Sequence, residues 1–189
     1  MTLTAERDWW VTSAIRDDIW GIGTWEEGVV ACAEQLAWMF AHRGRILDLG
    51  CGPGRLLIPF ARTYPGATWV GLDVRLYPAP QEPNVVWLVG DGESVPLTSG
   101  SLTGAYSVAV FQHLPHEVTR GYLTEIARCL RPGGRLCFQH VIGTEDSFLS
   151  HQADPELLAT WCREAGLVVE SCEVGAVHYQ WVWVRAVRP

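Results

Sequence analysis

The feature that most constrains this chain is an apolar strand that runs directly into three alternating glycines. Residues 46–55 read ILDLGCGPGR. Glycine adopts positive φ and has no Cβ, so the backbone of such a turn can lie directly against a ligand. The segment therefore predicts a nucleotide-type binding site. Its candidate residues are Asp48, Gly50, Cys51, Gly52 and Gly54.

The residues around these glycines do not suit a dinucleotide. A redox dinucleotide fold requires Gly-x-Gly-x-x-Gly and free amides around a pyrophosphate. Here Arg55 occupies the third glycine position and Pro53 lacks an amide donor. Asp48 places a carboxylate just before the turn, where it would repel a pyrophosphate. A zwitterion that carries an ammonium group would be attracted instead.

Two further predicted strands also end in a carboxylate. Residues 68–72 precede Asp73, and residues 85–89 precede Asp91 and Gly92. The carboxyl ends of parallel strands form the crevice in which such sheets bind ligands. The two oxygens of Asp73 suit the hydroxyls of a ribose. We expect Asp91 to accept a hydrogen bond from an adenine amino group, and the Gly92 amide to meet a ring nitrogen.

The glycine segment resembles motif I of the class I S-adenosylmethionine-dependent methyltransferases, an acidic residue followed by Gly-x-Gly-x-Gly. Residues 104–114 are similar to the fourth strand of that family and the segment after it, and residues 130–136 match its Leu-x-Pro-Gly-Gly turn. The resemblance, strong over residues 25–142, implies S-adenosylmethionine as cofactor, with S-adenosylhomocysteine as product. It adds Phe111 and Gln112 to the expected cofactor contacts, and it does not specify the acceptor or the oligomeric state.

Apolar periodicity predicts alternating helices and strands. Helices are expected from the capping box at Thr24 and Glu27 to about Gly44, and over 56–63, 116–130 and 154–165; strands are expected at about 45–49, 68–72, 85–89, 105–111, 135–142, 167–174 and 180–187. This pattern predicts a single α/β domain over 1–189, a three-layer sandwich with helices on both faces. The last two strands lie too close together for a helical crossover, so one is antiparallel. The resemblance implies the sheet order 3-2-1-4-5-7-6 with strand 7 reversed.

One connection departs from the pattern of the family. Residues 75–83 contain three prolines, which prevent the usual helix there. We expect a loop that covers the adenine side of the pocket, with Val74 or Tyr77 against the ring.

Tryptophans gather near the start of the chain, at positions 9, 10, 20 and 25. One interpretation is that their rings pack onto the sheet as core. The other is that residues 1–24 form a helical cap or lid over cofactor and acceptor, with Gly21 and Gly23 as the hinge. The sequence leaves both open.

The composition excludes several classes of protein. With 189 residues, 48% of them hydrophobic and 19% charged, the chain is typical of one globular domain. A net charge of −7 opposes binding to nucleic acid. The six cysteines show no metal-ligand spacing and indicate reduced thiols. The sequence shows no membrane-spanning stretch or signal segment, which predicts a cytoplasmic protein.

The chemistry of methyl transfer needs alignment above all, and it needs a base only if the nucleophile arrives protonated. His140, near the end of the fifth strand, and His113, after the fourth, are the candidate bases, although each also suits a structural or cofactor-capping role. No metal site is expected, because Glu145 and Asp146 are the only carboxylates directly after the fifth strand.

These observations predict a methyltransferase that acts on an O or N atom of a small molecule. One alternative is a non-catalytic S-adenosylmethionine-binding module that acts as a partner subunit. Another is a protein or RNA methyltransferase. Methylation of nucleic acid or of glutamine amides is disfavoured, because residues 111–114 read FQHL in place of an Asn/Asp-Pro-Pro-Tyr-type motif.

Overall fold

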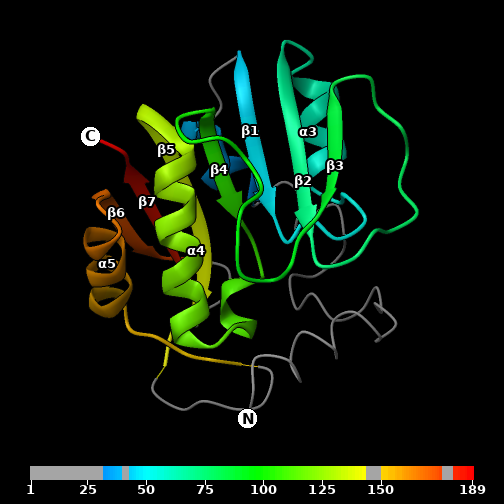
Figure 1. Ribbon diagram of the computed structural model, residues 1–189. Helices are drawn as coiled ribbons and strands as arrows, with labels where there is room; N and C mark the ends of the chain where they lie inside the picture. Colours follow the sequence, from blue (N-terminus) through cyan, green and yellow to red (C-terminus); the bar gives the residue numbers. More distant parts are fainter. Residues whose placement is uncertain (1–31, 40–42, 144–149, 176–180) are drawn as a thin grey trace.

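A seven-stranded sheet forms the centre of the computed structural model, which describes residues 32–39, 43–143, 150–175 and 181–189 (Figure 1). The strand order is β3-β2-β1-β4-β5-β7-β6. Strand β7 runs antiparallel to both of its neighbours, and the other pairs are parallel. The expected order and the reversed seventh strand are confirmed. The strands are β1 (Gly44–Leu49), β2 (Ala67–Asp73), β3 (Val85–Val89), β4 (Leu102–Ser107), β5 (Leu130–Val141), β6 (Val168–Val174) and β7 (Trp181–Val187).

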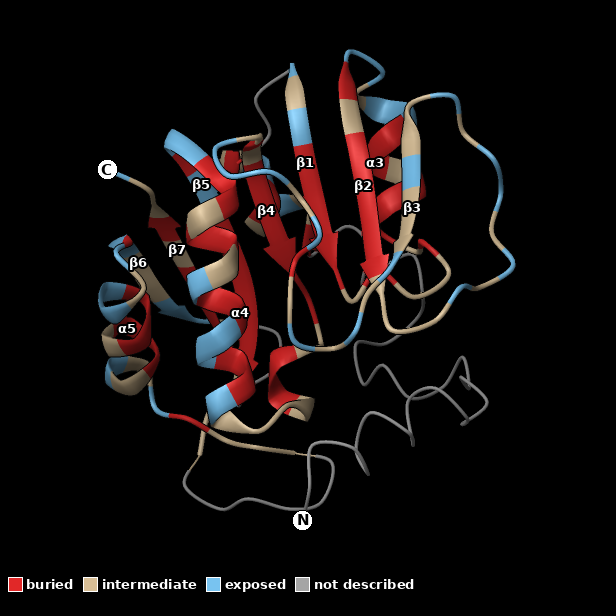
Figure 2. Ribbon diagram, in the orientation of Figure 1, coloured by how far each residue is buried: buried red, intermediate tan, exposed pale blue. Residues whose placement is uncertain are grey.

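Helices cover both faces of the sheet. The short 3-10 helix η1 (Ala37–Met39) and α3 (Leu57–Thr63) lie on one face, and α4 (His116–Cys129) and α5 (Pro155–Glu164) lie on the other. Figure 2 shows α4 buried on the side that faces the sheet and exposed on the opposite side. None of the helices in the described ranges is long and apolar enough to cross a membrane.

Two hydrophobic clusters, one on each face, follow from the two-residue period of the strands. In β1, Leu47 and Leu49 belong to the cluster under α4 and α5, whereas Ile46 belongs to the cluster under α3. Asp48 alternates with Leu47 and Leu49 and therefore faces the α3 side, as Ile46 does. The period thus places a carboxyl group among apolar side chains at the end of a central strand.

The fourth strand begins and ends earlier than expected. It was expected over 105–111, but β4 runs from Leu102 to Ser107, and residues 111–113 form the 3-10 helix η2. Ala109 lies between them with a φ of 58°, the left-handed conformation that ends an extended strand. The expectation was wrong because the apolar run continues past this backbone reversal.

Two other boundaries differ from expectation. β5 begins at Leu130, five residues before the expected start, and Gly44 begins β1 where it was expected to end a helix. The segment 75–83 contains no helix, as its prolines predicted. Most of the helix expected after Thr24 lies outside the described residues.

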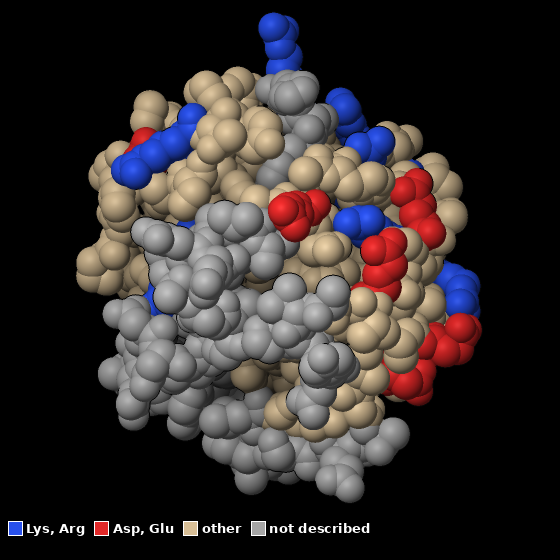
Figure 3. All heavy atoms as spheres, turned by 180° about the vertical axis from the view of Figure 1, so that it is seen from behind, with Lys and Arg blue, Asp and Glu red and all other residues tan. Residues whose placement is uncertain are grey.

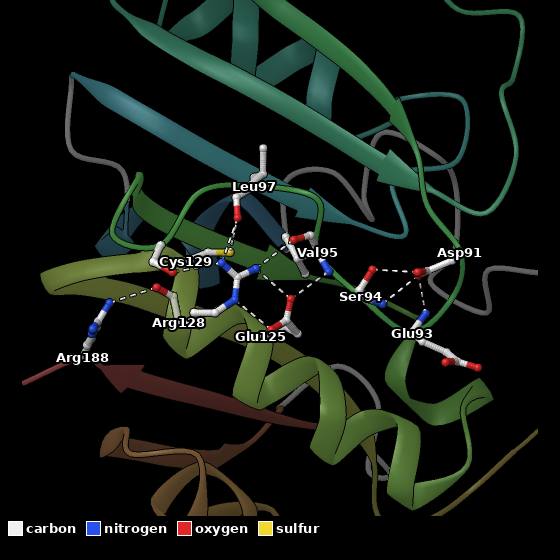
Figure 4. A network of polar contacts seen from close by, with 10 residues as sticks. Asp91, Glu93, Ser94, Val95, Leu97, Glu125, Arg128, Cys129 and Arg188 are labelled. Atoms are coloured by element: carbon white, nitrogen blue, oxygen red, sulfur yellow. Dashed lines mark hydrogen bonds and ion pairs between the residues drawn. The ribbon is translucent and has the colours of Figure 1, made fainter.

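The connection between β3 and β4 is held against α4 by one arginine (Figure 4). The Arg128 guanidinium donates to the carbonyls of Val95 and Leu97 over 3.0 and 2.9 Å, and it pairs with Glu125 over 2.7 Å. Glu125 in turn accepts from the Val95 amide. Since this connection carries Asp91, Arg128 fixes the segment that follows the third strand.

Replacing Arg128 with methionine should lower the free energy of unfolding by about 1–3 kcal/mol, because several charge-assisted hydrogen bonds are lost. Arg128→Lys should restore only part of this loss, since an ammonium group cannot reproduce the planar fork. Arg120→Met is the matched control: its pair with Glu164 is about half exposed on both sides, and such pairs contribute less than about 1 kcal/mol. Urea denaturation compares the variants, and equal losses at both positions would contradict the role given to Arg128.

Candidate functional site

The glycine loop folds back onto the end of β2. Glycines 50, 52 and 54 all have positive φ, which lets the chain reverse within five residues. The amides of Gly50 and Cys51 both donate to the Leu72 carbonyl, over 2.7 and 3.2 Å. The Gly54 amide donates to the Cys51 carbonyl over 2.9 Å. The loop is therefore tied to the neighbouring strand by its own backbone donors.

Asp73 completes this arrangement from the end of β2. One of its carboxylate oxygens accepts from the Gly52 amide over 2.8 Å, and the other accepts from the Val74 amide over 2.8 Å. Since Pro53 has no N–H group, every backbone donor between residues 50 and 54 already has an acceptor within the protein. The loop presents no free amide to a phosphate. Sequence reasoning assigned Asp73 to a ribose and missed its role in holding the loop.

Asp48 is buried beside the loop, with only 4% of its surface exposed. Tyr106 lies directly opposite it on β4, and the Tyr106 hydroxyl donates to its carboxyl group over 2.9 Å. The rings of Phe60 and Trp69 pack around Tyr106. Burial raises the pKa of Asp48 to about 8, and the nearby Asp73 carboxylate adds to the rise. The site therefore favours a ligand that brings positive charge.

Burial also raises the pKa of Asp73, while its backbone hydrogen bonds oppose the rise. Two carboxyl groups thus meet at the glycine loop. Sequence reasoning missed Tyr106, which the parallel register of β1 and β4 brings next to Asp48.

The glycines differ in what surrounds them. Among the described residues, a Cβ atom added to Gly52 would meet no atom within 4 Å, whereas one added to Gly54 would lie 2.4 Å from the Trp87 ring. Gly52 therefore borders open space, and Gly54 is required for packing. The Cys51 side chain is buried, and its Sγ lies against Gly71 of β2.

Asp91 lies at the start of the exposed connection after β3. Its carboxylate accepts from the Glu93 amide, the Ser94 amide and the Ser94 hydroxyl. These hydrogen bonds lower the pKa of Asp91 to about 2. Gly92 follows with a φ of 91°. Asp91 therefore shapes its own turn, and its expected contact with adenine, like that of Gly92, stays a prediction.

The segment after β4 contributes one core residue and one polar residue. The Phe111 side chain is fully buried against Phe138, with 5.1 Å between ring centroids. Gln112 is nearly buried and accepts a hydrogen bond from Gln139 over 2.9 Å. Any cofactor contact of Phe111 would come from its backbone.

Four histidines gather near the ends of β4 and β5. His140 is fully buried, and its Nδ1–H donates to its neighbour's carbonyl, that of Val141, over 2.9 Å. Its Nε2 therefore carries a lone pair, and no described residue donates to it. Burial lowers the pKa of His140 to about 4, and the neighbouring His116, His113 and His151 lower it further.

His116 and His151 also lie near His140, although the sequence analysis did not count them among its candidates. Their ring centroids lie 6.0 Å apart, and both rings lower the pKa of His140. They come from the start of α4 and from a segment beyond β5, so their spacing in the sequence does not predict that they lie close together. His113 follows β4 as expected, in η2.

Some expectations cannot be placed. The four N-terminal tryptophans and the Gly21 and Gly23 hinge lie outside the described residues, as do Glu145 and Asp146. Within the described ranges, no group of three or more His, Cys, Asp or Glu side chains is arranged to hold a metal ion.

Comparison with known proteins identifies a family for the segment that contains the glycine loop. Residues 46–134 match the family described as methyltransferase domain. The O-methyltransferase rstn1 of Aspergillus nomiae is 33% identical over 125 residues, which cover 61% of this chain and 52% of that protein. The chain thus spans about half the length of this curated relative.

Two solved structures share the fold. One is the complex of the Haloferax volcanii Trm112 methyltransferase activator with a methyltransferase (TM-score 0.73, 20% identity, 97% of each chain covered). The other is the Haemonchus contortus phosphoethanolamine N-methyltransferase 2 in complex with S-adenosyl-L-methionine (TM-score 0.72, 14% identity, 97% of this chain and 60% of that chain).

The sheet order, the closed glycine loop and the family match agree. Residues 46–134 match the methyltransferase domain family, and the seven-stranded sheet has the strand order expected for a class I, S-adenosylmethionine-dependent methyltransferase.

Proposed function

We propose that this protein transfers the methyl group of S-adenosylmethionine to an oxygen atom of a small molecule. One observation carries the proposal. The glycine loop has no free backbone donor, and two carboxyl groups lie beside it, those of the buried Asp48 and the partly buried Asp73. Such a site repels a pyrophosphate and attracts a ligand with an ammonium and a sulfonium group.

The residues present fit this cofactor, which supplies an electrophilic methyl group when bound. Asp48 would attract its positive charge, and Asp73 would accept hydrogen bonds from its ribose. Gly52 borders open space that allows close approach of a ligand to the backbone. The other proposed contacts to the cofactor come from Val74, Asp91, Gly92, Phe111 and Gln112.

His140 is the proposed base for the acceptor. Its neutral imidazole carries an Nε2 lone pair that can take the proton of a hydroxyl group. A carboxylate acceptor would need no base. The Aspergillus relative is named an O-methyltransferase, and this name favours oxygen over nitrogen as the methylated atom.

The surface supports a small acceptor rather than nucleic acid. In the described part of the face in Figure 3, acidic and basic side chains are interspersed and form no continuous basic patch. Arg62 pairs with Glu82, and Arg185 pairs with Glu173. All six cysteines are free, and free thiols fit our proposal that the protein acts in the cytoplasm.

An alternative is that the chain works with a partner subunit. The Haloferax structure, a complex with a methyltransferase activator, favours this second candidate. Methyl transfer by the purified chain alone would exclude a required partner.

Calorimetry with S-adenosylmethionine, S-adenosylhomocysteine and NAD tests the proposed cofactor. We expect the first two to bind and NAD not to bind. Gly52→Ala should weaken their binding at least about tenfold, because the added methyl group enters the ligand's space. Its melting temperature should fall less than that of Gly54→Ala, which drives a methyl group into Trp87. Binding of NAD alone would refute the proposal.

The stability of the Asp48→Asn variant tests the buried carboxyl group. Between its ordinary pKa of 3.8 and its folded pKa of about 8, Asp48 binds more protons in the folded state, so rising pH lowers stability across this window. Asparagine does not ionise and can still accept from Tyr106. We therefore expect Asp48→Asn to be more stable than the wild type without ligand, increasingly so from pH 5 to pH 9, and to bind S-adenosylmethionine about tenfold more weakly.

Asp91→Asn is the control of opposite sign. The folded pKa of Asp91, about 2, lies below its ordinary 3.8, so its ionised form stabilises the protein above that value. Asp91→Asn should therefore destabilise the protein by a constant amount from pH 5 to pH 9. Urea denaturation at several pH values measures both, and parallel curves for Asp48→Asn and wild type would rule out a titrating Asp48.

Loss of the proposed base should affect turnover rather than cofactor binding. With an acceptor found by screening hydroxyl and carboxyl compounds, His140→Ala should lower kcat about 10²–10⁴-fold for a hydroxyl acceptor and remove the acidic limb of the pH profile. In the wild type this limb should lie below pH 6.5, because the pKa of His140 is lowered to about 4. His116→Ala, which removes a neighbouring imidazole, is the control and should lose much less. A selective loss of S-adenosylmethionine affinity in His140→Ala would instead indicate a cofactor-capping role.

A further inference from the structure

The turn after β4 depends on a residue from β5. Ala109 is the only described non-glycine residue with positive φ. This conformation is unfavourable for alanine, so it persists only where other contacts impose it. The Ala109 amide donates to Oε1 of Gln139 over 2.8 Å. Gln139 is fully buried, so this hydrogen bond is shielded from water.

The turn at Ala109 lies against the glycine loop. A Cβ atom on Gly50 would lie 2.3 Å from Cγ2 of Val110, so the Val110 side chain sits directly on the Gly50 backbone. Any change in the conformation of Ala109 would move Val110. Gln139 therefore acts on the proposed cofactor site although it is not part of it.

The same glutamine also determines which ring nitrogen of His113 carries the proton. The Ala109 amide can only donate, so the Gln139 atom that meets it is its oxygen. The Gln139 nitrogen then donates to Oε1 of Gln112 over 2.9 Å. The Gln112 nitrogen must therefore donate to Nε2 of His113, at 3.4 Å. One backbone N–H group thus fixes the direction of the whole relay.

We propose that Gln139 is a positioning residue that holds the Ala109 turn against the glycine loop and, through Gln112, keeps the proton of His113 on Nδ1. The proposal deepens the proposed function, because it gives the two candidate bases different roles. The Nε2 lone pair of His113 is occupied by Gln112, whereas that of His140 is not engaged by any described residue. This difference favours His140 as the proposed base, because the Nε2 of His113 already accepts from Gln112.

Nuclear magnetic resonance of the ligand-free protein tests the relay directly. In the wild type, the ¹⁵N shifts of His113, assigned with His113→Asn, should show an unprotonated Nε2. Gln139→Met should release this tautomer preference and speed exchange of the Ala109 amide at least about tenfold. Gln112→Met should release the tautomer but leave the Ala109 amide protected. A protonated Nε2 in the wild type would overturn the proposal even if no variant folds.

Binding of S-adenosylhomocysteine tests the link to the site. Gln139→Met should weaken it about three- to tenfold. Adding Ala109→Gly should recover most of this loss, because glycine adopts the positive φ without support. Unchanged Ala109 exchange in a folded Gln139→Met variant would refute the positioning role, as would a double variant that binds no better than Gln139→Met. If the wild type binds no S-adenosylhomocysteine, the proposed function fails, while the resonance measurements still judge the relay.

Discussion

The hydrogen bonds between the glycine loop and the end of β2 are the interaction on which the site depends. The Leu72 carbonyl and the Asp73 carboxylate accept from the amides of Gly50, Cys51 and Gly52, so the protein itself holds the turn before any ligand arrives. These hydrogen bonds also determine the electrostatic character of the loop. A loop whose amides are free recruits phosphates, whereas a loop whose amides are used presents the carboxyl groups that surround it. The difference lies in hydrogen bonding and not in the number of glycines.

The burial of Asp48 comes at the expense of stability. The carboxyl group of Asp48 is buried, and its partner Tyr106 packs against Phe60 and Trp69. Such a group is unfavourable when ionised, and the Tyr106 hydrogen bond relieves only part of this cost. The aromatic cluster therefore does two things. It forms the core between α3 and the sheet, and it keeps water from the group that the ligand is proposed to need. Binding sites commonly retain such unfavourable groups, because preorganisation requires them.

The sequence predicted the architecture because strands and turns have local signals. Apolar runs located the strands, the prolines of 75–83 correctly excluded a helix, and the resemblance supplied the strand order. The failures came from contacts between distant residues. The end of β4 depends on Ala109 and on Gln139, thirty positions away, and no local pattern records that contact. Asp73 was identified as a site residue, but its partner at Gly52 follows only from the closeness of β1 and β2.

The proline-rich connection has a consequence for how the molecule meets its neighbours. It leads into β3, a five-residue strand at the edge of the sheet. Val86 and Val89 on this strand are about half exposed, and such an edge is a template for pairing with another chain. Because β3 is short, any such pairing is also short, and Pro83 has no N–H group that could extend it beyond the start of the strand. The segment that replaces a helix thus also restrains the sheet from growing beyond its seven strands.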